Sequence, residues 1–294
     1  MLVSARTTNV LLVVMIAIGI AIVAMLANGA LAGPLDPPAA PGSTDGVREA
    51  GTPISSIPFT ITQPGRYYLT RNLTAATGIN AVTIQANNVT LDLHGFTLQG
   101  PGGAGDGVLV SGSRSGIRIE DGTVVGWFNG VDAQTATSMV ASGLIVLANG
   151  FAENDGSYGF ISGTDSILED CLVRANKNTG VLLKEGSVIR RCSIVDHTGI
   201  GVLATADVLV EDNWFEFNGG SSSGAGLSIQ GSAVDVHGNT FHEHRDIAFV
   251  TGGASGVFDN ELYDCNTLVG LSAANPVPRD GSEHSNYVEF FAFC

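Results

Sequence analysis

A short pattern of three positions returns eight times along the chain: an apolar residue, a turn residue three positions later, and a second apolar residue two positions after that. The turn positions are Phe96, Gly122, Gly143, Cys171, Cys192, Asn213, Asn239 and Asn260. They follow one another at steps of 26, 21, 28, 21, 21, 26 and 21 residues. A base period of 21 residues with occasional insertions is typical of a solenoid whose coils carry loops on their sides.

The two apolar columns predict the core of this solenoid. The first column is Leu93, Ile119, Val140, Leu168, Ile189, Val210, Val236 and Val257. The second column is Leu98, Val124, Ile145, Val173, Ile194, Phe215, Phe241 and Leu262. Because side chains alternate along a strand, Glu211 and Trp214 are expected to point outward, between the inward residues of their coil.

Each coil also opens with a glycine and an apolar partner, as in Gly180-Val181. Glycine supplies the positive φ or the crowded corner that such a bend requires. Asn213, Asn239 and Asn260 share one column, so we expect an asparagine ladder whose amides form hydrogen bonds along the axis.

The two ends of the chain differ from the repeats. Residues 1–32 are predicted to be a secretory signal peptide, with one charge (Arg6), an apolar run and the cleavage pattern Ala30-Leu31-Ala32. An uncleaved membrane anchor is the alternative, and both place the protein outside the cytoplasm, secreted or in the cell envelope. Residues 33–53 are proline-rich and predicted to be a linker.

The charge balance limits the partners. The chain has 13 Lys and Arg against 28 Asp and Glu, a net charge of −15. Such a surface repels nucleic acid, and once the signal is cleaved no membrane contact is expected. An anionic polysaccharide would need a local basic patch or a bridging cation such as Ca²⁺, and no other cofactor is indicated.

Four cysteines allow three pairings. Cys171 and Cys192 occupy one column in adjacent coils and are predicted to be free buried thiols. Cys265 and Cys294 could instead tie the C-terminal tail to the last coil.

The chain resembles the right-handed parallel β-helix repeat proteins of the pectin-lyase-like superfamily. The resemblance is carried by the stretches at residues 61–69 and 89–98 and by the asparagine-centred coils, and it covers residues 54–266. It implies an all-β, single-stranded right-handed parallel β-helix of about eight coils, with an N-terminal cap and a capping tail at 267–294. The superfamily includes polysaccharide lyases, glycoside hydrolases, uronate epimerases, phage tailspikes and non-catalytic surface proteins, so the fold does not settle the function.

The motifs of the better-known enzymes of this superfamily are absent. The polygalacturonase motifs and the paired basic motif of pectate lyases do not occur. The epimerase motif Asp-Pro-His-Glu has only a partial counterpart in Phe241-His242-Glu243-His244.

Two outward columns hold the candidate site residues. One reads His94, Glu120, Ala141, Glu169, Arg190, Glu211, His237 and Phe258, and its alternating charges predict ion pairs between coils. The other reads Arg174, Val195, Glu216, His242 and Tyr263.

The second column lies near the densest group of titratable residues in the sequence. A lyase or epimerase acting on a uronate needs a partner for the carboxylate, a base and an acid. We expect Arg174 or Arg245 as the partner, His242 or His244 as the base, and Tyr263 as the acid.

Other roles remain open for the same residues. Glu216 with Glu243 would suit hydrolysis. Trp214 is expected to stack on a sugar, with His237 also in the binding region. A metal site of His237, His242 and His244 matches no standard zinc spacing.

The sequence thus predicts an exported β-helix protein that binds or modifies polysaccharide, with lyase- or epimerase-type chemistry on a uronate polymer as the leading reaction. A non-catalytic surface or envelope scaffold, or an adhesin, is the alternative. The oligomeric state stays open, with a trimer among the options.

Overall fold

The computed structural model describes residues 51–76, 78–151, 155–219, 224–242, 247–251, 256–258, 260–263, 268–269 and 287–289. The chain divides into two compact units, residues 1–49 and 50–294, and all described residues belong to the second. The expected signal peptide, most of the expected linker, Cys265 and Cys294 lie outside the described residues. In the part that is described, no helix is both long enough and apolar enough to cross a membrane.

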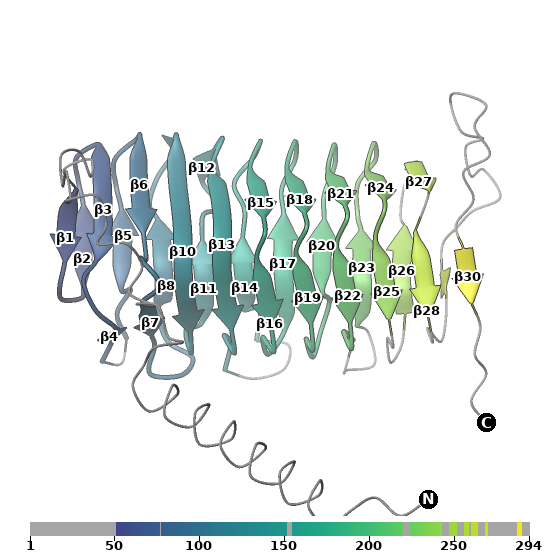
Figure 1. The fold of residues 1–294 in the computed structure, drawn as a ribbon, viewed down its shortest axis with the longest axis horizontal. Helices are drawn as coiled ribbons and strands as arrows, with labels where there is room; N and C mark the ends of the chain where they lie inside the picture. The colour runs from purple at the N-terminus through teal and green to yellow at the C-terminus, as the bar shows by residue number, and fades with distance from the viewer. Residues whose placement is uncertain are drawn as a thin grey trace, which may run out of the picture. The chain divides into compact units, whose positions relative to one another are not determined.

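The described unit is a parallel β-solenoid in which each coil contributes up to three short strands (Figure 1). The first-strand series is β1 (Thr52–Ile54), β3 (Gly65–Leu69), β6 (Val89–Asp92), the first half of β10 (Ile117–Val125), the first half of β13 (Val140–Leu147), β15 (Ile167–Glu169), β18 (Val188–Arg190), β21 (Leu209–Glu211), β24 (Asp235–His237) and β27 (Gly256–Phe258).

The second-strand series is β4 (Leu73–Thr74), β7 (Thr97–Gln99), the second halves of β10 and β13, β16 (Leu172–Arg174), β19 (Ser193–Val195), β22 (Trp214–Glu216), β25 (Thr240–His242), β28 (Glu261–Tyr263) and β30 (Tyr287–Glu289). Since β10 and β13 run through the bend between the two series, both belong to one 18-stranded sheet.

The third-strand series forms a separate ten-stranded sheet. It consists of β2 (Phe59–Ile61), β5 (Val82–Ile84), β8 (Asp106–Val110), β11 (Asn129–Asp132), β14 (Tyr158–Ile161), β17 (Thr179–Leu183), β20 (Val202–Ala204), β23 (Ala225–Ile229), β26 (Ile247–Thr251) and β29 (Leu268–Val269). A two-stranded sheet pairs β9 (Arg114–Ser115) with β12 (Ala136–Thr137).

The corner between the first and second strands turns on one residue in the left-handed region. Asp170, Arg191 and Asp212 occupy this position in successive coils with φ of 55°, 51° and 55°. The next residue in each coil is buried and lies at the bend of the chain. Cys171 and Cys192 take this place and are free buried thiols, as predicted. The hydrogen bond with Cys192 and burial raise the pKa of the Cys171 thiol.

Beyond the cysteines, the same corner is filled by amides that bond from coil to coil. The backbone N–H of Cys192 donates to Asn213 Oδ1 at 2.9 Å. Asn213 Nδ2 donates to Asn239 Oδ1, and Asn239 Nδ2 donates to Asn260 Oδ1, both at 3.0 Å. These bonds satisfy polar groups that the bend takes out of the strand ladders. In the core beside them, Phe215 and Phe241 stack with ring centroids 4.6 Å apart.

The corner after the second strand has its own buried column, which the sequence pattern did not reveal. Its members are Asn149, Asn176, His197 and Asn218. His197 accepts a hydrogen bond from the Asn176 backbone N–H at Nδ1 (3.1 Å), and its Nε2 lies 3.1 Å from the Val173 carbonyl oxygen. His197 N–H donates in turn to Asn218 Oδ1 at 3.2 Å. Burial lowers the pKa of His197 to about 4, so the ring is neutral and Nε2 carries its proton.

Two repeats are displaced from the predicted columns. Ala141 and Val146, rather than Val140 and Ile145, pair with Leu168 and Val173 and point inward, so the turn residue there is Leu144 instead of Gly143. A slip of one residue reverses every side chain of a strand.

In the earliest repeat, Leu91 rather than Leu93 pairs with Ile119. Two extra residues around the turn at His94 and Gly95 separate Leu91 from Leu98. The first outward column therefore contains Asp92, Glu120 and Ser142 in these coils, and His94 and Ala141 are not part of it.

Candidate functional site: an open pocket on the second-strand face

The outward side of the second-strand series brings together several predicted site residues. Arg174, Val195, Glu216 and His242 are paired in register on β16, β19, β22 and β25. The backbone of Tyr263 follows on β28. Adjacent parallel strands lie about 4.8 Å apart, so Arg174 and Glu216 are separated by about 10 Å along the axis. This column was predicted correctly.

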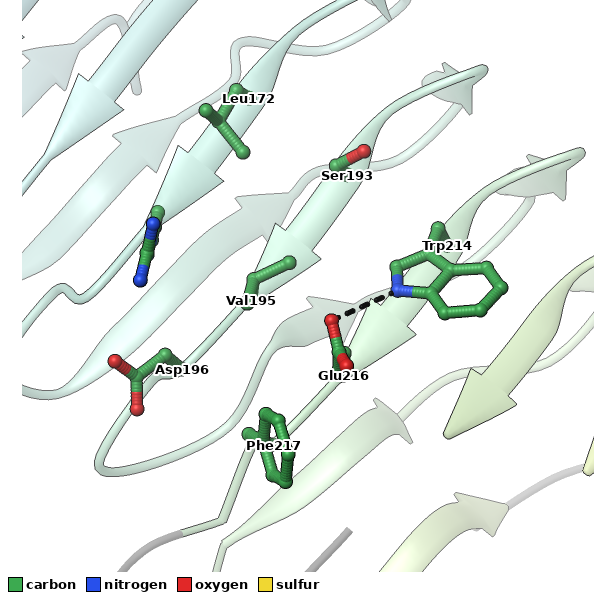
Figure 2. Close-up of a pocket in the computed structure, with 8 residues that line it drawn as sticks. Leu172, Ser193, Val195, Asp196, Trp214, Glu216 and Phe217 are labelled. Carbon is green, nitrogen blue, oxygen red and sulfur yellow. Dashed lines mark hydrogen bonds between the residues drawn. The ribbon is translucent and has the colours of Figure 1, made fainter. Parts of the chain in front are cut away.

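An open pocket of about 600 Å³ lies over these strands (Figure 2). It is lined by Leu172, Arg174, Ser193, Val195, Asp196, Trp214, Glu216 and Phe217. Trp214 and Phe217 are 41% and 38% exposed, whereas most large apolar side chains among the described residues are buried. Val195 lies between Arg174 and Glu216 in the register, and its short side chain leaves the space between them open.

Trp214, Glu216 and His242 form one contact group at the C-terminal side of the pocket. Trp214 Nε1 donates a hydrogen bond to Glu216 Oε2 at 3.2 Å, which Figure 2 marks with a dashed line. Glu216 Oε1 lies 3.5 Å from His242 Nδ1, and each of these two side chains is 27% exposed. The ring centroids of Trp214 and His242 are 5.7 Å apart, and the angle between the ring planes is 31°. The group thus combines an apolar ring face with a carboxylate and an imidazole.

The first-strand face, by contrast, neutralises its own charges. Arg190 contacts Glu169 at 2.8 Å and Glu211 at 3.8 Å, and Arg191 bridges Glu169 and Asp170. The hydrogen bond from Arg190 lowers the pKa of Glu169, and that from Arg191 lowers the pKa of Asp170. The ion pairs predicted from the alternating charges of this column are therefore confirmed.

His237 belongs to this first-strand face. Its Nε2 lies 3.7 Å from Glu211 Oε2, and the corner at Gly238 and Asn239 separates it from His242. His237 does not line the pocket, although the sequence suggested a place in the binding region.

Three further candidates have no described side chain. His244 and Arg245 lie outside the described residues, and Tyr263 is described by its backbone alone. Among the described residues, no group of three or more His, Cys, Asp or Glu side chains is arranged to hold a metal ion. The structure adds Leu172, Ser193, Asp196 and Phe217 to the site. Their positions in the strand and corner columns are the only signal in the sequence that could have identified them.

A parallel solenoid with three strands per coil and an open pocket on an outward strand face defines the chain as a β-helix protein. The chain matches the family described as "Right handed beta helix region" over residues 75–267, which is more than half of its length. It belongs to this right-handed β-helix family, and the predicted right-handed β-helix fold is confirmed.

Solved structures resemble the chain at low sequence identity. The Dettilon tailspike protein aligns with a TM-score of 0.52 at 12% identity, covering 72% of this chain and 54% of the tailspike. This chain thus spans about half the length of that protein. The A-module of a mannuronan C-5 epimerase from Azotobacter vinelandii aligns at 0.37 and 13% identity, covering 82% and 90% of the two chains. The catalytic domain of a GH87 α-1,3-glucanase aligns at 0.35 and 10%, covering 83% and 63%. At these identities the likeness is one of fold alone. No curated protein sequence matches the chain significantly.

Proposed function

We propose that this chain is an exported protein that binds polysaccharide along its second-strand face and modifies a uronate there by lyase- or epimerase-type chemistry. One observation carries the proposal: Trp214, Glu216 and His242 are in mutual contact in and beside the open pocket that Arg174 also lines. An exposed indole offers a flat apolar surface to a sugar ring, and a guanidinium pairs with a carboxylate.

Both reactions begin by removing the proton next to the uronate carboxyl group. Arg174 would bind the carboxylate and stabilise the negative charge that develops there. His242 is the proposed base. Glu216 faces its Nδ1 at 3.5 Å, which places Nε2 on the opposite side of the ring and stabilises the imidazolium that forms.

Tyr263 keeps its predicted role as the acid. Its backbone pairs with His242 one strand further along the solenoid. In an epimerase it would return a proton to the opposite face of the same carbon, and in a lyase it would protonate the leaving oxygen.

Proton removal can be measured before the polymer is known in detail. We expect the purified chain to exchange the uronate C5 proton for deuterium in heavy water, followed by NMR over a panel of uronate polysaccharides. His242→Gln and Glu216→Gln should lower the exchange rate about a hundredfold or more. Glu211→Gln is the matched control, since this glutamate contacts His237 on the other face, and it should exchange at the unaltered rate.

Exchange that is unaffected in the His242 and Glu216 variants would contradict these assignments. Binding of a uronate polysaccharide without any exchange would favour the non-catalytic scaffold or adhesin.

A further inference from the structure

On the N-terminal side of the pocket, the second-strand face carries mostly apolar side chains. Four of its six outward positions on β10, β13 and β16 are apolar and adjacent in register: Val125, Ile145, Leu147 and Leu172, with Thr123 and Arg174 at the other two. Ile145 is 40% exposed, and the other three apolar residues are half-buried. We call these four apolar residues the apolar platform. Four adjacent outward apolar side chains on a sheet face without a described covering element suggest a ligand surface.

The apolar platform and the pocket form one continuous surface. Leu172 belongs to both, because it lines the pocket and pairs with Ile145. Arg174 pairs with Leu147 and therefore stands at the boundary between them. Trp214, two strands beyond Leu172, continues the same outward column on the other side. A ligand lying along the axis would cross the apolar platform, Arg174 and the Trp214 group in that order.

The charges of this face argue against a ligand with a carboxylate on every sugar. At the outward positions of the second-strand series, in the described strands from β7 to β25, Arg174 is the one side chain with a fixed positive charge. Asp196 and Glu216 are negative and line the same pocket, and the chain carries a net charge of −15. A polyuronate would therefore meet one cation and two carboxylates, whereas a single uronate would be matched at Arg174.

We propose that the ligand is a heteropolysaccharide that places one uronate at Arg174 and uncharged, methyl-bearing sugars on the apolar platform. O-acetyl, N-acetyl and 6-deoxy groups share this chemistry, since each presents a methyl group. The inference rests on the proposed polysaccharide function and adds the substrate class. Each methyl group buried against Ile145, Leu147 or Val125 should strengthen binding about fourfold.

The test compares matched ligands that differ in acetylation alone. Xanthan and other acetylated heteropolysaccharides with one uronate in each repeat unit would be used in native form and after alkaline deacetylation, with binding measured by calorimetry. The wild-type chain should bind an acetylated form about fourfold more tightly than its deacetylated partner for each acetyl group that lies on the apolar platform. The double variant I145T/L147T should lose that preference while it still binds the deacetylated form.

Leu182 and Leu203 provide a matched control. They are outward, half-buried and paired with each other on the third-strand sheet, so L182T/L203T should keep the wild-type preference. Trp214→Ala should weaken binding of both ligand forms alike.

The two proposals fail in different ways. Equal binding of acetylated and deacetylated forms would overturn the inference and leave the polysaccharide function standing. Absence of binding to every polymer, with the variants folded, would overturn both.

Discussion

His197 is a titratable side chain that is buried in its neutral form and holds the corner column together by hydrogen bonds. Its Nδ1 accepts the Asn176 N–H and its Nε2 meets the Val173 carbonyl, as the side-chain oxygen and nitrogen of an asparagine would. Asn218 makes the equivalent bonds, with Oδ1 accepting the His197 N–H and Nδ2 donating to Ile194 O. Burial lowers the pKa of His197 from 6.5 to about 4. Between these values the unfolded chain binds a proton that the folded chain does not, so stability falls as pH drops through this window, by about 3 kcal/mol at pH 4.

We predict that His197→Asn removes this part of the acid sensitivity. The asparagine should form the same hydrogen bonds to the neighbouring coils, so the free energy of unfolding near pH 7.5 should change by about 1 kcal/mol at most. Urea unfolding of both chains at pH 7.5 and 4.5 measures the difference directly, and carboxylates such as Glu169 affect both chains equally. An identical loss of stability in wild type and variant would contradict the role given to His197. His197→Ala, which leaves the Asn176 N–H without an acceptor, should be about 1–3 kcal/mol less stable than His197→Asn at both pH values.

Alternation along a strand predicts which residues point outward, but not which face a residue reaches after a corner. Trp214 outward and Phe215 inward follow from alternation and are confirmed. His237 and His242 are five positions apart and were expected in one region. The left-handed residue Gly238 and the buried Asn239 turn the chain between them, so the two imidazoles lie on different faces. The buried position of His197 was equally hard to predict, because the residue type alone does not distinguish a buried corner residue from a surface residue.

At the level of the elements, several coils carry a glycine where no side chain fits. Gly159 in β14, Gly180 in β17 and Gly201 just before β20 stack in successive coils, and none has a positive φ. A Cβ on Gly180 would overlap both His197 Nε2 and the carbonyl oxygen of Gly201. Of the two reasons that the sequence allowed for these glycines, crowding is therefore the operative one.

We predict that Gly180→Ala destabilises the chain by about 2–3 kcal/mol, because the crowding atoms belong to the backbone and to a buried ring that cannot move aside. Leu182→Ala, on the outward side of the same strand, should cost about 1 kcal/mol. Chemical denaturation of the two variants is the measurement. A Gly180→Ala chain as stable as wild type would show that the coils can separate without cost.

The element register was predicted correctly in most repeats, and in the repeat of Val140 it failed by one residue within a run of three apolar residues. Met139, Val140 and Ala141 form an unbroken apolar run, and the stronger hydrophobic residue Val140 was taken as inward. Packing instead selects the small Ala141, which pairs with Ile119 and Leu168 in the core. Only the neighbouring coils decide between such alternatives, since a coil buries its apolar residues against them.

At the scale of the whole molecule, each coil stacks on its nearest neighbours, so the fold should tolerate the loss of one coil even where the binding site does not. The backbone N–H of Cys192 donates to Asn213 Oδ1 one coil, 21 residues, away, and the second corner repeats at the same interval from Asn176 to His197 and from His197 to Asn218. Removing residues 192–212 would join Arg191 to Asn213 and keep all three corners in phase. Cys171 would then meet Asn213, and Asn176 would meet Asn218, so an acceptor remains for each backbone N–H.

We predict that this 21-residue deletion folds, whereas a deletion of residues 192–211, one residue shorter, does not. The longer deletion keeps strand parity, while the shorter one reverses every side chain in the joined strand. Circular dichroism and thermal unfolding should show a cooperative β-protein for the first and aggregation or loss of structure for the second.

The folded deletion should nevertheless lose polysaccharide binding, because it removes Val195 and Asp196 and brings Arg174 within one strand of Glu216, closing the pocket between them. Retained binding would place the ligand elsewhere on the solenoid, and misfolding of both deletions would contradict the repeat as an independent unit.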